Sequence, residues 1–387
     1  MRHLHTSFAA FALFSATAMS TPSASAAELV IGELHPITGQ ASYYGIPMSR
    51  GMQLAIKQIN DQGGLKIGDE TYQVRLETGD DQATGVAGVA ATRKLIANSV
   101  KYIIGPQSSP VASAVAPIMK SADVVQIIDG STAENIVNNV NTFRTTVTAG
   151  TYDDAVVKIA DIRKSQTIAF LTNRLAAGFM VTEKDLVAKL EKGSHKVVSQ
   201  SYFKVGDTDF SAQITQIMQL KPDALFLRDA PVEDALITKQ ARQLGYKGDI
   251  VWEVNAPATT VVKNITDEDM NGVYNGIPPK TDYFVDRKTP AAMALREAYK
   301  AMFNADLGEN SAISYDSANL LFVALQKAKS TDPKAVAEAL KTVKVSEIPR
   351  LVTEFVPQKD GLLFEEGQAK LPTLAQVWKD GAWHLVN

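Results

Sequence analysis

The 387-residue sequence contains no cysteine. This absence excludes a disulfide framework, a thiolate nucleophile and a cysteine-ligated zinc site. Histidine is also scarce, because only His35, His195 and His384 follow the N-terminal segment. These three lie far apart in sequence and show no paired-ligand spacing such as HExxH, so a histidine metal site is not expected. The sequence therefore predicts neither a metal nor another cofactor.

Catalytic and nucleotide-binding motifs are missing as well. There is no GxSxG motif of a serine hydrolase, and no GxGxxG follows the first predicted strand. The segment GPQSSP at residues 105–110 lacks the Gly-Lys-Ser/Thr ending of a phosphate-binding loop. The net charge of -3 gives no sign of a nucleic-acid partner. We therefore predict a protein that is neither an enzyme nor a nucleic-acid-binding protein.

Long apolar runs are confined to the N-terminus. Residues 1–26 combine a basic start, a short apolar run and small residues ending at Ala26, and no acidic residue precedes Glu28. This order is typical of a cleavable signal peptide, and we predict cleavage after Ala26 or Ala27 and a periplasmic location. No later segment stays apolar for the roughly 20 residues that a membrane helix needs. The exported chain is therefore expected to be soluble.

Strand-like and helix-like segments alternate twice along the chain, over residues 28–129 and again over 166–254. Such alternation predicts βαβ units with parallel sheets, and about 360 residues after export suit two domains. Three further helices are expected near the C-terminus, followed by a hairpin over residues 375–386 that turns at Asp380-Gly381. Since no low-complexity linker separates the two halves, we expect two α/β lobes in contact.

Three polar turns follow strands in the first half, at residues 35–45, 105–110 and 129–135. In an open parallel sheet such turns gather at the carboxyl edge, where ligands bind. The last two lead into helix N-termini with free N–H groups, and Ser109 or Thr132 would add a hydroxyl. Together they predict a site for a carboxylate. The alternative that these hydroxyls only cap helices stays open, because Ser and Thr are the commonest caps.

Several segments of the chain carry a family resemblance: HPITGQASYYG with the following helix and INDQGG, KYIIGPQSSPVASAVAP, FRTT, GDTDFSAQITQI and LITKQARQLGYKG. They resemble the branched-chain amino-acid-binding family of type I periplasmic binding proteins. The similarity covers nearly the whole exported chain in order. It implies an α/β fold of two Rossmann-like lobes joined by a three-strand hinge, closing over a ligand that is passed to the permease and ATPase subunits of an ABC importer. We also expect a monomer.

The resemblance also implies lobe boundaries. Lobe 1 would comprise residues 28–146 and 277–353. Lobe 2 would comprise residues 147–276 and 354–387.

The resemblance implies a set of ligand contacts. A carboxylate would bind the Ser109 hydroxyl and the hydroxyl and amide of Thr132. The backbone carbonyl of Gly130 would face an amino group, and Tyr44 would line the cleft. Ser108 and Ser131 are included in the predicted site as neighbours of these residues.

The sequence departs from the family on the second lobe. Ala177 and Ala230 stand where amino-acid binders place aromatic side chains, which predicts a larger cleft. Arg228 is interpreted either as a contact to a carboxylate or oxo-acid, or as a salt-bridge partner of Asp229 or Glu233; both interpretations are open. Glu253 is a candidate partner for a ligand ammonium, but it lies one position out of register, which reverses a side chain in a strand.

We therefore predict a carboxylate ligand bulkier than leucine, such as an aromatic or 2-oxo acid. A branched-chain or other amino acid is the alternative for the same transporter type. A ligand sensor for a membrane receptor would use the same closing cleft. The remaining rival is an exported serine hydrolase, in which His35 would act as the base for Ser108 or Ser109.

Overall fold

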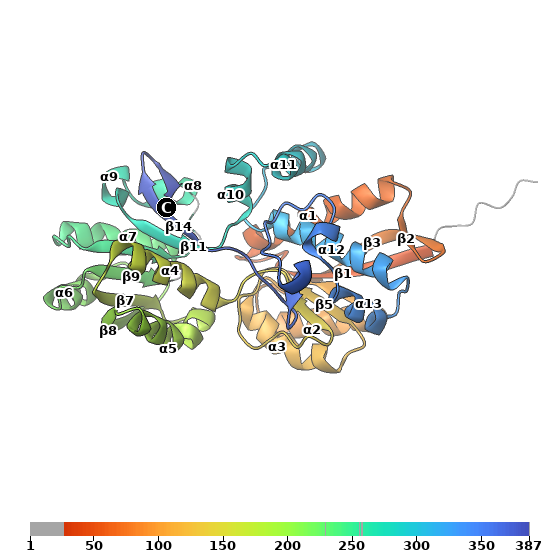
Figure 1. Cartoon of the computed structure of the whole chain (residues 1–387), viewed down its shortest axis with the longest axis horizontal. Coiled ribbons are helices and arrows are strands. Elements are labelled where there is room, and N and C mark those ends of the chain that lie inside the picture. Colours follow the sequence, from red (N-terminus) through yellow and green to blue (C-terminus); the bar gives the residue numbers. More distant parts are fainter. Residues whose placement is uncertain (1–26, 229, 255, 257, 387) are drawn as a thin grey trace, which may run out of the picture.

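The chain forms two α/β lobes that lie side by side (Figure 1). This computed structural model describes residues 27–386 except 229, 255 and 257, and it leaves the side chains of residues 177, 259, 260 and 262 undescribed. The predicted signal peptide, residues 1–26, therefore lies outside the described residues.

Lobe 1 is built on an eight-stranded sheet of order β12-β13-β6-β5-β4-β1-β3-β2. The central pairs are parallel, whereas β2 and β12 each pair antiparallel to a neighbour. The strands are β1 (Ala27–His35), β2 (Leu65–Ile67), β3 (Glu70–Asp80), β4 (Tyr102–Ile104), β5 (Val125–Ile128), β6 (Thr142–Arg144), β12 (Phe364–Glu365) and β13 (Gln368–Ala369). The helices are α1 (Ser42–Asp61), α2 (Gly85–Ala97), α3 (Ser109–Ser121), α10 (Thr281–Asp286), α11 (Pro290–Phe303), α12 (Ser311–Ala328) and α13 (Pro333–Leu340), and Val345–Glu347 and Lys359–Gly361 are 3-10 turns.

Lobe 2 is built on a seven-stranded sheet of order β15-β14-β11-β10-β9-β7-β8. Its strands from β7 to β11 are parallel, and β14 and β15 complete one edge in antiparallel pairing. The strands are β7 (Thr167–Asn173), β8 (Lys196–Phe203), β9 (Ala224–Arg228), β10 (Asp249–Glu253), β11 (Tyr274–Ile277), β14 (Leu374–Lys379) and β15 (Ala382–Leu385). The helices are α4 (Ala149–Arg163), α5 (Ala177–Lys192), α6 (Ser211–Gln219), α7 (Pro231–Gln243), α8 (Ala258–Asn264) and α9 (Asp267–Met270).

The sheets form where the sequence is apolar on successive positions. All five residues of β9 are buried and the first four are apolar, because helices cover both faces of a parallel sheet. In lobe 1, α12 crosses the core and is buried along most of its length, so residues from the last third of the chain complete a lobe that begins at residue 27. The predicted fold class is thus confirmed.

The chain passes between the lobes three times, at residues 145–148, 278–280 and 370–373. The predicted boundary between residues 353 and 354 is wrong. The strands β12 and β13 pair with β6 of the first sheet, where Gln368 lies opposite Arg144 and donates to the Thr146 carbonyl at 2.7 Å. Residues 354–369 therefore belong to lobe 1, and the lobe 2 sheet resumes only at Leu374.

The C-terminal hairpin follows the predicted turn. Asp380 and Gly381 have φ values of 51° and 75°, as a type I′ turn between β14 and β15 requires. Trp378 and Trp383 on the two strands pack with ring centroids 5.1 Å apart, and Trp383 lies 6.1 Å from Trp252. The three tryptophans of the protein therefore cluster in lobe 2.

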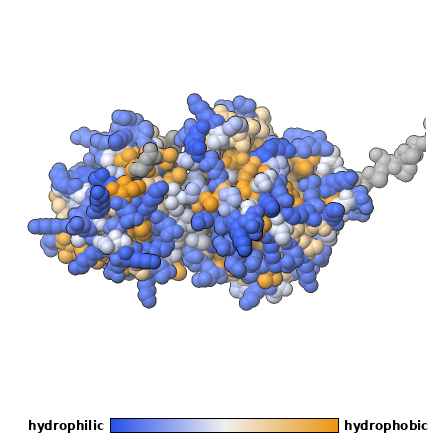
Figure 2. Space-filling model, viewed as in Figure 1, coloured by the Kyte–Doolittle hydropathy of each residue, from blue (hydrophilic) through white to orange (hydrophobic). Residues whose placement is uncertain are grey.

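The outer surface is largely hydrophilic in this view, with separate hydrophobic patches over both lobes (Figure 2). Among the helices that the structure describes, none combines the length and apolar character that a membrane crossing requires.

Candidate ligand-binding cleft

A cleft of about 510 Å³ lies between the lobes. Lobe 1 contributes the loops that follow β1, β4 and β5, and lobe 2 contributes the starts of α4, α5 and α7. The second crossing between the lobes adds the side chain of Lys280. The lining residues are Tyr43, Tyr44, Gln107, Ser108, Ser109, Pro110, Gly130, Thr132, Tyr152, Leu175, Ala176, Gly178, Phe179, Val205, Ala230, Pro231, Val232, Glu233, Val254, Lys280, Glu309 and Asn310.

The two serines after β4 do not cap α3 with their side chains. Ser108 has the backbone conformation of an N-cap, yet its hydroxyl donates to the Ala83 carbonyl at 3.4 Å instead of accepting from the helix. The hydroxyl of Ser109, the first helical residue, accepts a 3.2 Å hydrogen bond from Ser131. The N-terminus of α3 is therefore left without a side-chain cap at the cleft wall, which suits an anion.

The turn after β5 packs directly on the turn after β4. A Cβ atom on Gly130 would lie 2.6 Å from the Cα atom of Gln107, so only glycine permits this approach. The Ser131 amide donates to the Pro106 carbonyl at 3.1 Å, and the buried Ser131 side chain supports Ser109 from behind. Ser109, Gly130 and Thr132 thus line one wall together, as the sequence predicted, whereas Ser131 lies behind them.

A buried charge cluster supports this wall. His35 has no exposed surface, and its Nε2 atom lies 3.1 Å from the carboxylate of Asp129, which also accepts from Ser314 at 2.6 Å. The other ring nitrogen lies 3.4 Å from Glu33. Burial alone would lower the pKa of His35, but the Asp129 and Glu33 carboxylates raise that pKa to about 10. Asp129 directly precedes Gly130, so the cluster fixes the start of the turn.

The same cluster weakens the hydrolase hypothesis. Both nitrogens of His35 face buried carboxylates, and a cationic imidazole cannot accept a proton from a serine. Ser108 and Ser109 bond to Ala83 and Ser131 in the described structure. The arrangement of nucleophile, base and orienting group that a serine hydrolase needs is therefore not formed around His35.

The lobe 2 wall is mainly apolar. Phe179 packs edge-to-face on Tyr152 at 5.5 Å, and Ala230 and Val254 lie beside them in the cleft lining. The acidic side chain of this wall, Glu233, accepts from the Gly206 amide at 2.8 Å. Ala230 does line the cleft as expected, whereas the side chain of Ala177 lies outside the described residues.

Arg228 and Glu253 do not line the cleft. Arg228 has no exposed surface and forms ion pairs with Asp153 at 2.6 Å, with Glu183 at 3.4 Å and with Glu253. Burial tends to lower the pKa of Arg228, but Glu253 and Asp153 raise it, so the guanidinium stays charged. Arg228 thus forms salt bridges, as one interpretation expected, but its described partners come from α4, α5 and β10, and it does not line the cleft as the other interpretation requires. Of the two proposed partners, Glu233 bonds elsewhere and Asp229 lies outside the described residues.

The sequence analysis missed a polar group at the hinge. Lys280, Glu309 and Asn310 line the cleft from the second crossing and the residues just before α12. Lys280 follows β11 in the same way that the predicted turns follow β4 and β5. The rule that polar turns gather at the carboxyl edge of a sheet, if applied to lobe 2, would have identified it.

Two lobes that the chain connects three times, with a cleft at the carboxyl edges of both sheets, form the arrangement of a protein that binds a small ligand between its lobes. The family model described as "Periplasmic binding protein" matches residues 28–365, and the chain belongs to this family. It is a branched-chain amino-acid-binding type member, a periplasmic solute-binding protein of ABC transporters for small ligands.

Curated relatives agree with this assignment. The Leu/Ile/Val-binding protein BraC3 of Rhizobium johnstonii is 26% identical over 330 residues, which cover 84% of this chain and 86% of that protein. A homologue from Brucella abortus, Leu/Ile/Val-binding protein homolog 1, is 25% identical over 328 residues, with 81% and 82% covered.

Solved structures share the fold. A leucine-binding protein LivK from Thermotoga maritima has a TM-score of 0.74 at 22% identity, and the match covers 93% of this chain and 98% of that one. A solute-binding protein from R. palustris in complex with benzoate has a TM-score of 0.73 at 18% identity, with 93% and 96% covered. One from Rhodopseudomonas palustris BisB5 in complex with 3,4-dihydroxybenzoic acid has a TM-score of 0.71 at 20% identity, with 93% and 96% covered.

Proposed function

We propose that this protein is a monomeric binding protein that captures an organic acid bulkier than leucine, an aromatic or 2-oxo acid, and delivers it to an ABC importer. The ligand carboxylate would bind Ser109, Thr132 and the N-terminus of α3. Its apolar body would lie against Tyr44 on one lobe and Phe179 on the other.

One observation supports this ligand class above the others. Glu253, the acid expected to face a ligand ammonium, is fully buried in an ion pair with Arg228. A ligand with a free α-amino group would then lose that partner and depend on another carboxylate of the lining, because an unpaired ammonium in a closed cleft is costly. An acid without an amino group avoids this cost. The benzoate and dihydroxybenzoic acid complexes of similar fold are consistent with such a ligand.

A branched-chain amino acid is the second candidate. The relatives named as Leu/Ile/Val-binding proteins favour it, and Glu309 supplies a carboxylate in the cleft lining. In that case Glu309 would take the role that the sequence analysis gave to Glu253.

Isothermal titration calorimetry separates the two candidates. Leucine, phenylalanine, benzoate and phenylpyruvate are titrated into the protein after denaturation and refolding, which removes copurified ligand. We expect binding of benzoate or phenylpyruvate and weaker or no binding of leucine. Tight binding of leucine together with no binding of the larger acids would reject the proposal in favour of the amino acid.

A further inference from the structure

The hinge places a buried cation in the cleft. Among the lining residues that the structure describes, Lys280 is the one lysine or arginine. It follows Pro278 and Pro279 in the second crossing, and two successive prolines restrict the backbone there. Its side chain is 10% exposed, so the ammonium is held at the base of the cleft and not in bulk water.

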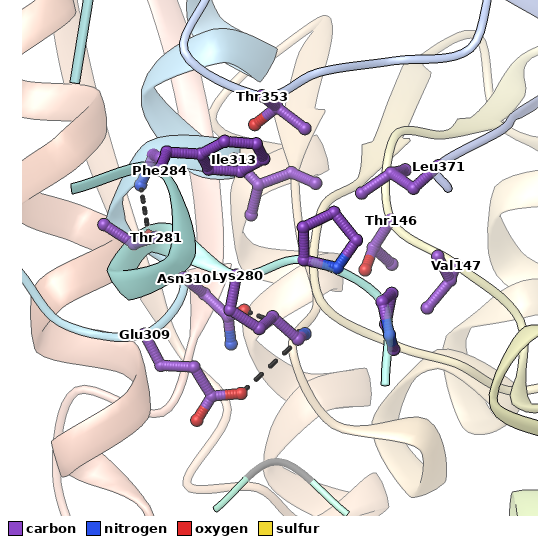
Figure 3. Close-up of a pocket in the computed structure, with 13 residues that line it drawn as sticks. Thr146, Val147, Lys280, Thr281, Phe284, Glu309, Asn310, Ile313, Thr353 and Leu371 are labelled. Carbon is purple, nitrogen blue, oxygen red and sulfur yellow. Dashed lines mark hydrogen bonds and ion pairs between the residues drawn. The ribbon is translucent and has the colours of Figure 1, made fainter. Parts of the chain in front are cut away.

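This ammonium has neutral hydrogen-bond partners, among them Tyr152, and a distant counter-charge. The Nζ atom donates to Asn310 Oδ1 at 3.2 Å, and Glu309 Oε1 lies 3.7 Å away, beyond a normal hydrogen bond (Figure 3). Burial alone would lower the pKa of Lys280, but Tyr152 and Glu309 raise it, so the side chain stays protonated at neutral pH. A buried ammonium whose counter-charge is distant is stabilised when a further oxygen atom accepts a hydrogen bond from it.

The surroundings of Lys280 restrict which molecule can supply an oxygen to its ammonium. Lys280 also borders a separate cavity of about 10 Å³ beside Thr146, Phe284 and Leu371, which is too small for an organic group. The open side is the main cleft, whose lining also includes Tyr152 and Asn310. An oxygen that reaches Lys280 would therefore belong to a molecule in the main cleft.

We propose that Lys280, with Asn310 and Tyr152, forms a second polar subsite that binds an oxygen substituent of the ligand, remote from the carboxylate held at Ser109. This subsite rests on the proposed function, because it requires the carboxylate to occupy the Ser109 wall. The preferred ligand class is then an aromatic acid with a hydroxyl or second carboxylate on the ring.

Calorimetry with a ligand series tests the subsite. Benzoate, 3-hydroxybenzoate, 4-hydroxybenzoate and terephthalate are titrated into the wild-type protein and Lys280→Met. We expect the wild type to bind at least one oxygen-bearing acid about tenfold or more tightly than benzoate, as a hydrogen bond to a charged group would give. In Lys280→Met this preference should disappear, so the oxygen-bearing acid should lose about tenfold more affinity than benzoate loses.

Glu309→Gln provides an independent measurement, since it keeps the ammonium and removes its counter-charge. It should strengthen terephthalate binding relative to benzoate, and it covers the case in which Lys280→Met fails to fold. Lys280→Met could weaken the binding of all four acids equally, and Glu309→Gln could leave terephthalate binding unchanged relative to benzoate. Together these results would show that the Lys280–Glu309 pair only stabilises the hinge. If the wild type binds benzoate but shows no preference among the acids, the subsite is rejected and the proposed function stands. Binding of none of the four acids rejects the subsite, and the proposed function is rejected as well only if phenylpyruvate also fails to bind.

Discussion

Ser109 combines two tasks at the scale of a single residue. It begins α3, and its hydroxyl accepts from Ser131 while facing the cleft. Because that hydrogen bond uses the Ser131 proton, the Ser109 proton is available to a ligand oxygen. A helix-capping role would instead direct the oxygen at the helix amides, and no such bond is formed by Ser108 at the N-cap position.

Replacing Ser109 with alanine should therefore weaken ligand binding without unfolding the protein. The expected loss is about 1–3 kcal/mol, the contribution of one hydrogen bond to a charged group. Calorimetry gives the affinity, and a thermal melt gives the stability. Ser113→Ala is the matched control, because Ser113 is exposed on the same helix. Equal affinity for the wild type and Ser109→Ala would show that Ser109 does not contact the ligand.

The burial of Asp81 predicts how the stability of the fold depends on pH. It is fully buried, and its Oδ2 atom has no hydrogen-bond partner within the described chain. Burial raises the pKa of Asp81 to about 6, although a hydrogen bond from Ala83 opposes the shift. The folded protein therefore holds this proton more tightly than the unfolded chain does, so ionisation of Asp81 reduces stability as pH rises from about 4 through 6.

Asp81→Asn should remove this reduction. We expect the variant to gain on the order of 3 kcal/mol relative to wild type between pH 4 and pH 8, following 1.4 kcal/mol per pKa unit. Urea unfolding at both pH values measures it. Asp80→Asn is the control with the opposite sign, because hydrogen bonds from Thr38 and neighbouring amides outweigh burial and lower the pKa of Asp80. A stability difference between wild type and Asp81→Asn that does not vary with pH would contradict this account.

At the scale of secondary-structure elements, Arg228 joins four of them. Its guanidinium at the end of β9 pairs with Asp153 on α4, Glu183 on α5 and Glu253 on β10. Burial raises the pKa of Asp153 and raises that of Glu253 well above its usual range, while the positive charge of Arg228 opposes both shifts. Without that charge, three carboxylates would remain close together in a site that water does not reach.

Arg228→Met should therefore destabilise lobe 2 by about 3–5 kcal/mol, as removal of one partner of a buried ion pair does. Urea unfolding followed by tryptophan fluorescence measures this loss directly, because the three tryptophans lie in the same lobe. The control is Arg163→Met, which removes an exposed pair with Asp249 and should cost less than about 1 kcal/mol. If Arg228→Met instead weakened ligand binding without changing stability, the result would indicate that Arg228 contacts the ligand.

The sequence predicted some helices and strands correctly and missed others. The alternation of apolar and helical periods located α1 to α3, α5 to α7 and the long strands, because each has enough residues to show its period, whereas α4 was not predicted. The strands β12 and β13 have two residues each and show no period, so the last lobe boundary was misplaced. Ser109 and Thr132 were candidates from their local turns, whereas Gly130 was named only from the family resemblance. The partners of Arg228 lie 25 to 75 residues away in sequence, so no local pattern could identify them.

At the scale of the whole molecule, the cleft lining is incompletely buried. Tyr43 is 64% exposed, Leu175 67% and Val205 58%, and all three line the cleft. Closure of the lobes over a ligand would remove this apolar surface from water, which favours the closed form. The ligand adds to this effect because it contacts both walls only when they approach.

Small-angle X-ray scattering should therefore show a smaller radius of gyration when the ligand is present. The measurement uses the tightest-binding acid from the calorimetric series at saturation. Ser109→Ala at the same acid concentration should remain nearer the value of the free protein, because weaker binding shifts fewer molecules to the closed form. A radius that does not change at saturation would show that this protein binds without lobe closure.

The three crossings have a consequence for the order in which the molecule can be made. Lobe 1 needs α12 and the β12–β13 hairpin, and lobe 2 needs the β14–β15 edge that ends at Leu385. A nascent polypeptide that ends at residue 277 therefore contains most of the strands, but neither lobe is complete. Stable folding must wait until nearly the entire polypeptide is synthesised, and no single truncation can release an intact lobe.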